Sequence, residues 1–181
     1  MTAISEVDIQ NYLTKKQYEK AFNKLLQVYQ ERIYWQIRKM VLHHEDANDV
    51  SQNVWIKAWK GLPKFSGRSA IYTWLYRIAH NESITYLNKQ RMKIADDSEQ
   101  YFQTTYANLQ SDADFRGDEI EAKLQAAIAS LPPKQQAVFN MKYFEEKKYQ
   151  EMADILQTSV GALKASYHHA VKKIEKFIKG N

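Results

Sequence analysis

Residues 46–93 read DANDVSQNVWIKAWKGLPKFSGRSAIYTWLYRIAHNESITYLNKQRMK and contain three of the chain's four tryptophans. The stretch predicts a helix with an acidic start, a basic loop broken by Pro63 and Gly67, and a second helix with a basic end. Aromatic residues alternate there with cations: Phe65, Tyr72, Trp74 and Tyr76 lie among Lys64, Arg68 and Arg77. Each aromatic residue taken singly is more often part of a core, but the combination is typical of surfaces that stack on unpaired bases and hold their phosphates.

The composition is that of a globular helical protein. The 181 residues are 44% hydrophobic and 26% charged, and they include only five glycines and three prolines, which favours helices over turn-rich sheets. The absence of cysteine excludes disulfides, thiolate metal sites and thiolate nucleophiles. No apolar run approaches the roughly 20 residues of a membrane span, and the first residues do not resemble a signal peptide. We therefore expect a cytoplasmic protein without membrane insertion.

Charge is unevenly distributed along the chain, whose overall net charge is +5. Residues 62–93 carry a net charge of +5 and residues 164–179 carry +4, whereas residues 96–121 between them carry −7. Two basic modules joined by an acidic segment fit a polyanion that is contacted at two places. Ordinary solvated helix faces would give the same charges, so charge alone leaves both interpretations open.

Apolar residues at helical spacing predict a first module of three helices, over residues 18–42, 47–60 and 70–92. In the second helix Val50, Val54 and Ala58 are predicted to face the core. A different face of that helix carries Asp49, Gln52, Asn53, Ile56 and Lys60. Such a mixture occurs both on solvated faces and on docking surfaces. The residues themselves do not choose between the two.

The third helix is predicted to bury one stripe and to expose another face. The buried stripe comprises Ile71, Leu75, Ile78, Ala79, Ile84 and Leu87. Off the stripe lie side chains that can stack on bases or hydrogen-bond to their edges, namely Tyr72, Tyr76, His80, Asn81, Ser83 and Asn88.

A cluster of polar residues before the second helix raises a metal hypothesis. His43, His44, Glu45, Asp46 and Asp49 offer imidazole and carboxylate ligands, but adjacent histidines diverge on a helix and no metal-binding spacing is present. We favour a helix start capped by Glu45 or Asp46, where carboxylates suit the helix dipole.

Residues 95–117 lose periodicity and predict an acidic, flexible linker. Its apolar residues, Tyr101, Phe102, Tyr106 and Leu109, either dock transiently or form a short helix. A second helical module follows from about Asp118, with Pro133 in the first turn of a helix over residues 134–144. Residues 149–156 and a final helix from about Gly161 to Lys179 then predict a helix-turn-helix, whose second helix lies in the major groove of DNA.

Three blocks of the sequence, in this order, resemble bacterial extracytoplasmic-function (ECF) sigma factors, and among them the group found in Bacteroidetes. DANDVSQNVWIKAW (46–59) is similar to the region 2 helix of that family, usually DAEDLVQETFxxAW. FSGRSAIYTWLYRIAHN (65–81) is similar to a further part of region 2, with FxGxS followed by WLYRIAxN. SLPPKQQAVF (130–139), YQEMADIL (149–156) and SVGALKASYHHA (159–170) resemble region 4. The resemblance covers nearly the whole chain.

The resemblance implies an all-α fold of two small helical domains joined by the acidic flexible linker. Region 2 would span residues 1–94, the linker 95–117, and the region 4 helix-turn-helix 118–181. Such a protein is not an enzyme and has no cofactor; it binds core RNA polymerase and directs it to promoter DNA, melted at −10 and duplex at −35. The linker would run through polymerase toward the RNA exit path, mimicking nucleic acid. An anti-sigma factor, often membrane-anchored in this family, is the expected further partner.

The resemblance also assigns three surfaces. The core polymerase-binding surface comprises Asp46, Asp49, Gln52, Asn53 and Ile56. The −10 surface comprises Lys64, Phe65, Ser66, Gly67, Arg68, Ser69, Tyr72, Arg77, His80 and Asn81. The −35 surface comprises Ser159, Lys164, Ala165, Ser166, His168, His169, Lys172 and Lys173. Several aromatic residues, Trp74 above all, are then expected to belong to the core.

The sequence departs from the family pattern in both regions. Asn48 and Asn53 stand where glutamates are usual, which removes two charges from the docking face. Residues 165–169 replace the common S-R-x-x-R, so two arginines suited to bidentate guanine contacts are missing. We expect −35 readout to depend more on Lys164 and the histidines. The alternatives are a helix-turn-helix regulator that binds duplex DNA without polymerase, a metal-dependent hydrolase, and a pure adaptor.

Overall fold

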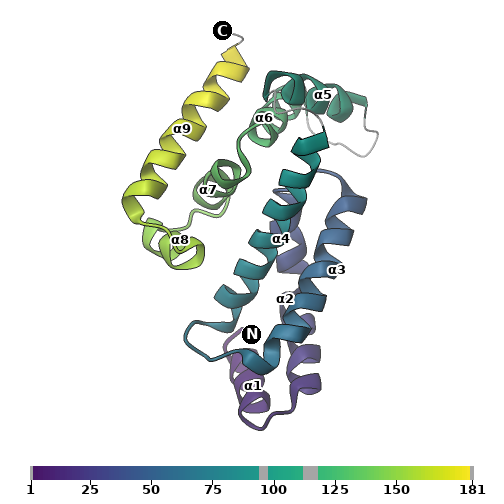
Figure 1. Cartoon of the computed structure of the whole chain (residues 1–181), viewed down its shortest axis with the longest axis vertical. Coiled ribbons are helices and arrows are strands. Elements are labelled where there is room, and N and C mark those ends of the chain that lie inside the picture. Colours follow the sequence, from purple (N-terminus) through teal and green to yellow (C-terminus); the bar gives the residue numbers. More distant parts are fainter. Residues whose placement is uncertain (1, 94–97, 112–117, 180–181) are drawn as a thin grey trace. The chain divides into compact units, whose positions relative to one another are not determined.

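The computed structural model describes residues 2–93, 98–111 and 118–179, and every regular element in these ranges is a helix (Figure 1). In chain order these are α1 (Thr2–Thr14), α2 (Tyr18–Arg38), α3 (His44–Gly61), the 3-10 turn η1 (Leu62–Lys64), α4 (Ile71–Lys93), α5 (Ser98–Ser111), α6 (Glu119–Ala129), α7 (Pro133–Tyr143), α8 (Tyr149–Leu156) and α9 (Val160–Lys179). The predicted all-α class is confirmed. None of the helices described is both long enough and apolar enough to cross a membrane.

The chain divides into two compact units, Met1–Ser83 and Ile84–Asn181. The division lies inside α4, so the last turns of that helix pack with the second unit. The expected domain limits at residues 94 and 118 describe regions of sequence rather than packing units. They remain predictions.

The core of the first unit is formed by apolar residues that recur every three to four positions. On α2 the buried residues include Leu25, Ile33 and Ile37. On α3 the predicted stripe of Val50, Val54 and Ala58 is buried. The helices predicted over residues 18–42 and 47–60 are therefore present and present the expected faces to the core.

The buried face of α4 is wider than the sequence predicts. Ile71, Leu75, Ala79 and Leu87 are buried as predicted, whereas Ile78 and Ile84 are half-buried. Tyr76 and Ser83, predicted to lie off this face, are only 2% and 1% exposed. Burial of Ser83 is tolerated because its hydroxyl donates to the Ala79 carbonyl at 2.9 Å, which satisfies the polar group locally.

The sequence predicts no helix before Tyr18, but α1 packs on α2 in the first unit. Ile9 is fully buried, and the Tyr29 hydroxyl of α2 donates a hydrogen bond to the Glu6 carboxylate of α1. Burial, together with this hydrogen bond, raises the pKa of Tyr29 far above its ordinary value. Tyr29 is therefore a neutral, buried link between the two helices.

The second unit contains the predicted helix-turn-helix. The Asp118 side chain accepts a hydrogen bond from the Glu121 backbone N–H at 2.8 Å and caps α6, and Pro133 lies in the first turn of α7 as predicted. Helix α8 ends at Leu156 and is followed by Gln157, whose φ of 51° is left-handed; α9 begins at Val160.

The segment predicted as a flexible linker contains an ordered helix, α5. Phe102 and Leu109 are buried, and the Phe102 ring stacks on Phe177 of α9 with centroids 4.8 Å apart. Phe102, Tyr106 and Leu109 follow one another at spacings of four and three, which gives α5 one apolar stripe despite its polar composition. Of the two alternatives for this segment, the short helix is confirmed. Residues 94–97 and 112–117 lie outside the described residues.

Candidate functional site

Helix α3 carries the residues expected to bind polymerase on its exposed side. Asp49, Gln52, Asn53 and Ile56 are exposed and Asp46 is half-exposed. At 100° per residue, Asp49, Gln52 and Ile56 lie roughly opposite the buried Val54, and Asp46 and Asn53 lie at one edge of that face, about 80° and 100° from Val54. The structure therefore brings these five residues onto one face. The predicted cap is wrong: α3 starts at His44, with His43 as an N-cap that makes no side-chain hydrogen bond, and Glu45 and Asp46 lie in the first turn.

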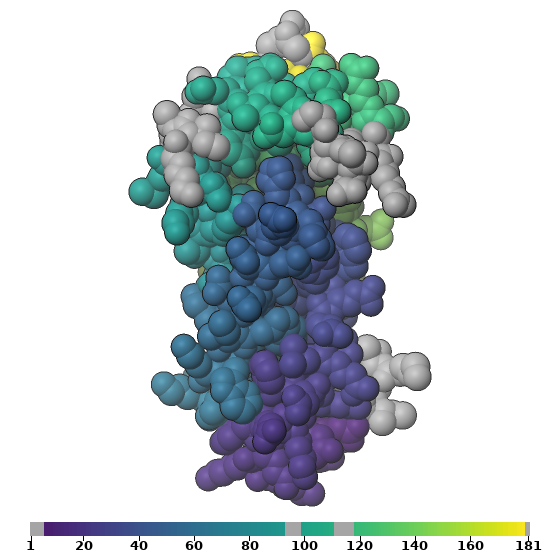
Figure 2. All heavy atoms as spheres, turned by 90° about the vertical axis from the view of Figure 1, so that its right-hand side faces the viewer, coloured from purple at the N-terminus to yellow at the C-terminus, as the bar shows by residue number. Residues whose placement is uncertain are grey.

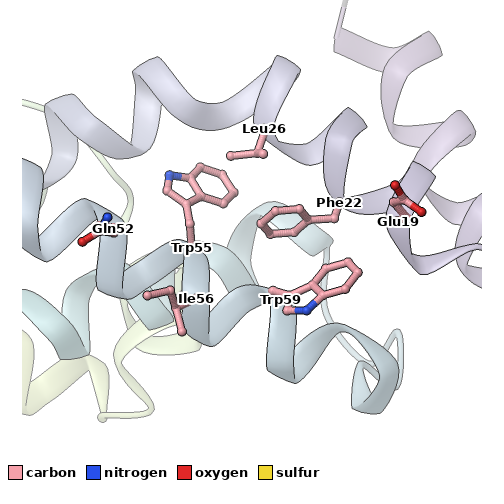
Figure 3. A pocket seen from close by; sticks show the side chains of 7 residues that line it. All are labelled: Glu19, Phe22, Leu26, Gln52, Trp55, Ile56 and Trp59. Atoms are coloured by element: carbon pink, nitrogen blue, oxygen red, sulfur yellow. The ribbon is translucent and has the colours of Figure 1, made fainter.

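An apolar groove adjoins this face, between α2 and α3 (Figure 3). It has a volume of about 650 Å³ and is lined by Glu19, Phe22, Leu26, Gln52, Trp55, Ile56 and Trp59. The Phe22 ring meets Trp59 and Trp55 edge-on, with centroids 5.2 and 6.0 Å apart. Figure 2 shows this side of the first unit, with α3 in blue at its surface. Gln52 and Ile56 belong to both the groove and the predicted docking face.

Sequence reasoning missed this groove. Trp59 is 44% exposed and Ile56 is 46% exposed, although the simplest expectation for each tryptophan is a place in the core. The available signal was the matching i, i+4 spacing of Phe22 and Leu26 on α2 and of Trp55 and Trp59 on α3. That spacing shows that each pair shares a helix face, but not that the two faces meet at the surface.

The histidine and carboxylate cluster at the start of α3 does not form a metal site in the part of the chain that the structure describes. The ring of His44 is held by protein groups, because its Nδ1 lies 2.6 Å from the Tyr34 hydroxyl and its Nε2 lies 3.0 Å from the Asn48 amide nitrogen. The metal-dependent hydrolase interpretation is therefore not supported, because the residues that it needs as metal ligands do not come together in the described part of the chain.

The loop between α3 and α4 is shaped by one tryptophan and two glycines. Trp74 is half-buried rather than a core residue, so that prediction is wrong; its ring lies 5.2 Å from the Phe65 ring, centroid to centroid. A Cβ on Gly61 would lie 3.0 Å from Trp74 Cζ2. The absence of a side chain at Gly61 therefore leaves room for the indole to pack against the end of α3. Gly67 has a φ of 69°, a left-handed conformation that glycine adopts without strain. Lys64, Ser66 and Arg68 are exposed and Ser69 is half-buried.

The residues of α4 assigned to −10 DNA do not form one surface. Arg77, His80 and Asn81 share a side of the helix, since His80 and Asn81 lie three and four residues beyond Arg77. Tyr72 lies about 140° around the helix from Arg77. Its ring contacts Tyr29 of α2 at 5.4 Å between centroids, and the Arg32 guanidinium lies 3.9 Å above it. Tyr72 is therefore engaged in packing α4 onto α2.

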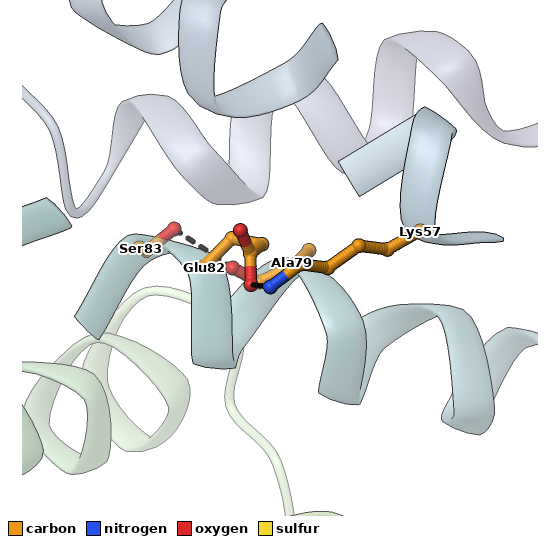
Figure 4. A network of polar contacts seen from close by, with 4 residues as sticks. All are labelled: Lys57, Ala79, Glu82 and Ser83. Atoms are coloured by element: carbon orange, nitrogen blue, oxygen red, sulfur yellow. Dashed lines mark hydrogen bonds and ion pairs between the residues drawn. The ribbon is translucent and has the colours of Figure 1, made fainter. Parts of the chain in front are cut away.

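Glu82 is the only acidic residue in residues 62–93, and α3 neutralises it (Figure 4). The Lys57 ammonium of α3 forms an ion pair with the Glu82 carboxylate of α4, whose side chain is only 13% exposed. Figure 4 also shows the hydrogen bond from the Ser83 hydroxyl to the Ala79 carbonyl on the preceding turn of α4. The pair joins the two helices and leaves the cations of α4 without a competing free carboxylate from Glu82.

Helix α9 buries one stripe and exposes most of the predicted −35 residues on the opposite side. Leu163, Ala170, Ile174 and Phe177 are buried. The exposed residues of the predicted set are Lys164, Ala165, His168, His169 and Lys172, joined by Ser159 at the start of the helix. Ser166 and Lys173 are half-buried at the edges of this face. The structure thus exposes six of the eight predicted residues on this side of α9.

The start of α9 is fixed by a cap and by an aromatic contact with α8. The Ser159 hydroxyl accepts a hydrogen bond from the Ala162 backbone N–H at 3.2 Å. The Lys164 ammonium lies 5.8 Å from the centroid of the Tyr149 ring, and the Lys142 ammonium lies 5.2 Å from the same centroid. Burial, with a smaller contribution from Tyr167, raises the pKa of Tyr149, so the ring stays neutral beside these lysines.

Two parts of the chain match profiles of one protein family: residues 25–92 match Sigma-70 region 2, and residues 121–174 match Sigma-70, region 4. The RNA polymerase sigma-H factor of Pseudomonas aeruginosa is 32% identical over 167 residues, which cover 87% of this chain and 86% of that protein. The ECF RNA polymerase sigma-E factor of Haemophilus influenzae is 30% identical over 165 residues, 87% of each chain. The chain belongs to the ECF family of RNA polymerase sigma factors.

A solved structure of a sigma factor has the same fold. The sigma factor RpoE of Bartonella quintana, in complex with the anti-sigma factor NepR, has a TM-score of 0.63 at 18% identity and covers 88% of this chain and 98% of its own. In the present ECF sigma factor, α3 and the loop before α4 lie within the region 2 match, and α8 with most of α9 lies within the region 4 match. A protein with both regions directs promoter-dependent transcription initiation. A helix-turn-helix regulator acting without polymerase is not favoured, because it would leave region 2 without a role.

Proposed function

We propose that this sigma factor binds core RNA polymerase through α3, captures unpaired −10 bases at the loop before α4, and reads the −35 element with α9. The observation that carries the proposal is the order of the two regions, each with an exposed polar or basic surface. Polymerase performs the chemistry, and the sigma factor contributes binding energy, so we propose no enzymatic activity for the chain itself.

The polymerase-docking surface that we propose combines the α3 face with the groove beside it. Asn48 and Asn53 provide no charge where the family usually has glutamates, so fewer ion pairs are available to this chain. The exposed side chains of Ile56 and Trp59 supply apolar area instead. Tryptophans that a partner buries are frequent hot spots of protein interfaces. We therefore propose that Asp46, Asp49, Gln52, Asn53 and Ile56 dock together with Trp59.

The proposed −10 surface is smaller than the set derived from the resemblance. It comprises the loop Lys64–Ser69, together with Arg77, His80 and Asn81. Tyr72 is left out because its ring is already covered by Tyr29 and Arg32. Unstacking costs a few kcal/mol per base, and stacking on an aromatic ring returns about 1–3 kcal/mol. With one aromatic ring fewer, we expect DNA melting to depend strongly on the promoter.

The proposed −35 surface is the exposed face of α9. Lys164, His168 and His169 lie in the turns that reach base edges when such a helix enters the major groove, and Lys172 lies further along, where phosphates pass. Ser166 and Lys173, half-buried at the edges, are proposed to contact the DNA backbone.

Four finer points belong to the same proposal. We propose that an anti-sigma factor restrains this sigma factor, by analogy with the complex of RpoE and NepR, and that it is membrane-anchored, as is common for such partners in this family. The chain acts in the cytoplasm, where polymerase works. The regions follow the limits 1–94, 95–117 and 118–181. The chain groups with the ECF sigma factors of Bacteroidetes, which a phylogenetic tree of region 2 sequences would test.

Run-off transcription with core polymerase on fragments of the source genome tests the proposed function. We expect discrete transcripts that require both the protein and core polymerase. Core polymerase alone is the control. Absence of any transcript that depends on the protein, together with tight and specific duplex binding by the protein alone, would replace this proposal with the helix-turn-helix regulator.

A further inference from the structure

We propose that Lys57 of α3 supports capture of the −10 strand without touching DNA. By pairing with Glu82, it keeps a negative charge away from the surface that receives the strand, so Lys57 is a positioning residue that acts through Glu82. The inference rests on the proposed function, because it concerns the charge of the proposed −10 surface.

Glu82 lies at the edge of that surface. It directly follows Asn81, and at 100° per residue it lies about 100° around α4 from Asn81. Its carboxylate is therefore on the order of 10 Å from a phosphate held beside Asn81, which is about one Debye length at 0.1 M salt. Over that distance solvent ions screen the charge only in part. A Glu82 carboxylate without a cation would therefore repel the DNA strand.

The Lys57 side chain extends from α3 to this carboxylate and neutralises it (Figure 4). The side chain of Glu82 is only 13% exposed, whereas that of Lys57 is 58% exposed. Ordinary surface ion pairs contribute little, because water solvates both partners well when they separate. Water reaches Glu82 poorly, so its charge depends on the cation more than the charge of a surface carboxylate would.

The position of Lys57 leaves two other roles to be tested. At 100° per residue, Lys57 lies about 40° around α3 from Asn53, at the edge of the proposed docking face. An exposed lysine there could contact polymerase, or it could bind a DNA phosphate directly. The ammonium is already engaged by Glu82, which favours the role through Glu82. The three roles predict different results for the same set of variants.

Three variants test the proposal: Lys57→Met, Glu82→Gln and the two changes together. The probe is a promoter fragment identified by run-off transcription and bound by the holoenzyme at saturating core polymerase. Permanganate reactivity of unpaired thymines measures the open fraction. We expect Lys57→Met to lower the equilibrium constant of opening about fivefold, because a charge 10 Å away changes an equilibrium by about 2- to 15-fold at an effective dielectric constant of 80 to 20.

Glu82→Gln is expected to restore opening in the Lys57→Met protein, because the charge that Lys57 neutralises is then gone. Glu82→Gln alone is expected to open the promoter at least as well as the wild type. If the double variant stays as defective as Lys57→Met, Lys57 binds DNA itself. If Glu82→Gln alone impairs opening as much as Lys57→Met does, the pair matters only for the fold. Either result would overturn the proposal, as would normal opening by Lys57→Met.

Salt dependence separates an electrostatic cause from a structural one. The Debye length shortens to about 4 Å at 0.5 M salt, so the defect of Lys57→Met is expected to shrink as salt is raised. The same defect is expected in the affinity of the holoenzyme for a fragment that is already unpaired at −10, because the charge acts on the held strand. A defect that salt leaves unchanged, accompanied by a lower melting temperature, would make Lys57 a structural residue.

Matched variants control for charge and for docking. Lys57→Arg keeps a cation beside Glu82 and is expected to open the promoter like the wild type. Lys20→Met removes the same charge from an exposed position of α2 and is expected to have no effect. Fluorescence titration is expected to give equal affinities of Lys57→Met and the wild type for core polymerase. A defect that reflects only weaker polymerase binding would assign Lys57 to the docking face instead.

The wild-type protein separates this proposal from the proposed function. If the wild type opens the promoter and Lys57→Met opens it equally well, only the role of Lys57 is refuted. If the wild-type holoenzyme opens no promoter, the proposed function is wrong, and the role of Lys57 is refuted with it.

Discussion

The close approach of Gly61 and Trp74 predicts how substitutions at these two residues change the free energy of unfolding. Gly61 has right-handed helical backbone angles, which alanine adopts with a loss of conformational entropy on folding that costs about 0.5–1 kcal/mol less than for glycine. The Cβ that alanine adds, however, would lie 3.0 Å from Trp74 Cζ2. Overpacking costs about 1–3 kcal/mol, so Gly61→Ala is expected to destabilise the wild-type protein. In a Trp74→Ala background the same change is expected to stabilise it. Urea unfolding of the four proteins of this cycle measures the coupling.

Gly161→Ala is the matched control, because no atom lies within 4 Å of the Cβ position there. It is expected to stabilise the protein in both backgrounds. Trp74→Ala alone is expected to cost about 2 kcal/mol, less than for a fully buried tryptophan, because the side chain is half-buried. Additive effects of the Gly61 and Trp74 changes would contradict the close contact.

Asp49→Arg tests the docking face of α3. The carboxylate is exposed at the middle of the predicted set, so its reversal is not expected to disturb the core of the first unit. Reversing a charge within an interface typically costs at least about 2 kcal/mol, and we expect core polymerase binding to weaken roughly 30-fold. Fluorescence titration with core polymerase measures it. Glu31→Arg, an exposed reversal on the outer side of α2, is the control, and equal losses for the two variants would refute the assignment.

Trp59→Ala tests the groove. Loss of a tryptophan at an interface hot spot costs at least about 2 kcal/mol of binding, whereas its partial exposure in the free protein limits the loss of stability. We expect weaker polymerase binding with a melting temperature close to that of the wild type. Trp35→Ala is the control, since Trp35 is 56% exposed on α2 but does not line the groove. A large drop in thermal stability with unchanged polymerase affinity would make Trp59 a structural residue.

At the scale of the element, we propose that different residues of α9 position the DNA and read its sequence. Lys172 lies on its outer face further along the helix, so Lys172→Ala is expected to weaken promoter binding about equally for all sequences and to reduce the salt dependence by about one unit of slope. Lys164 lies in an early turn beside Tyr149, so Lys164→Ala is expected to change the preferred −35 sequence. Binding of the holoenzyme to a promoter library at several salt concentrations measures both. A change in preference from Lys172 alone would reverse the two roles.

The individual helices also show which features of the fold could be predicted from the sequence. Strong apolar periodicity predicts α2, α3, α4 and the helix-turn-helix, because each buries one face. Helix α1 lacks such a stripe, and its main anchors, Ile9 and the bond from Tyr29 to Glu6, depend on α2 being present. The groove likewise depends on how α2 and α3 meet, which no single helix specifies. The contacts of Tyr72 with Tyr29 and Arg32 could not be predicted, because these partners are some 40 residues distant in sequence.

At the scale of the whole molecule, the two basic surfaces belong to one chain, and we propose that they serve one promoter. Each alone contacts a short DNA element and is expected to bind weakly, because a few phosphate contacts give affinities of only about 10⁻⁴–10⁻⁶ M at physiological salt. Bound together through polymerase, they reinforce each other by raising the effective concentration of the second contact.

We therefore expect the isolated sigma factor to bind promoter DNA weakly and with little sequence preference, and the holoenzyme to bind it tightly and specifically. Gel-shift titrations of one promoter and one scrambled fragment, with and without core polymerase, make the comparison. Inserting five base pairs between the −35 and −10 elements rotates them by about half a turn of DNA and is expected to abolish the gain while leaving each element intact. If the insertion has no effect, or if the isolated protein already discriminates between the fragments, the two surfaces do not work as one promoter-reading unit.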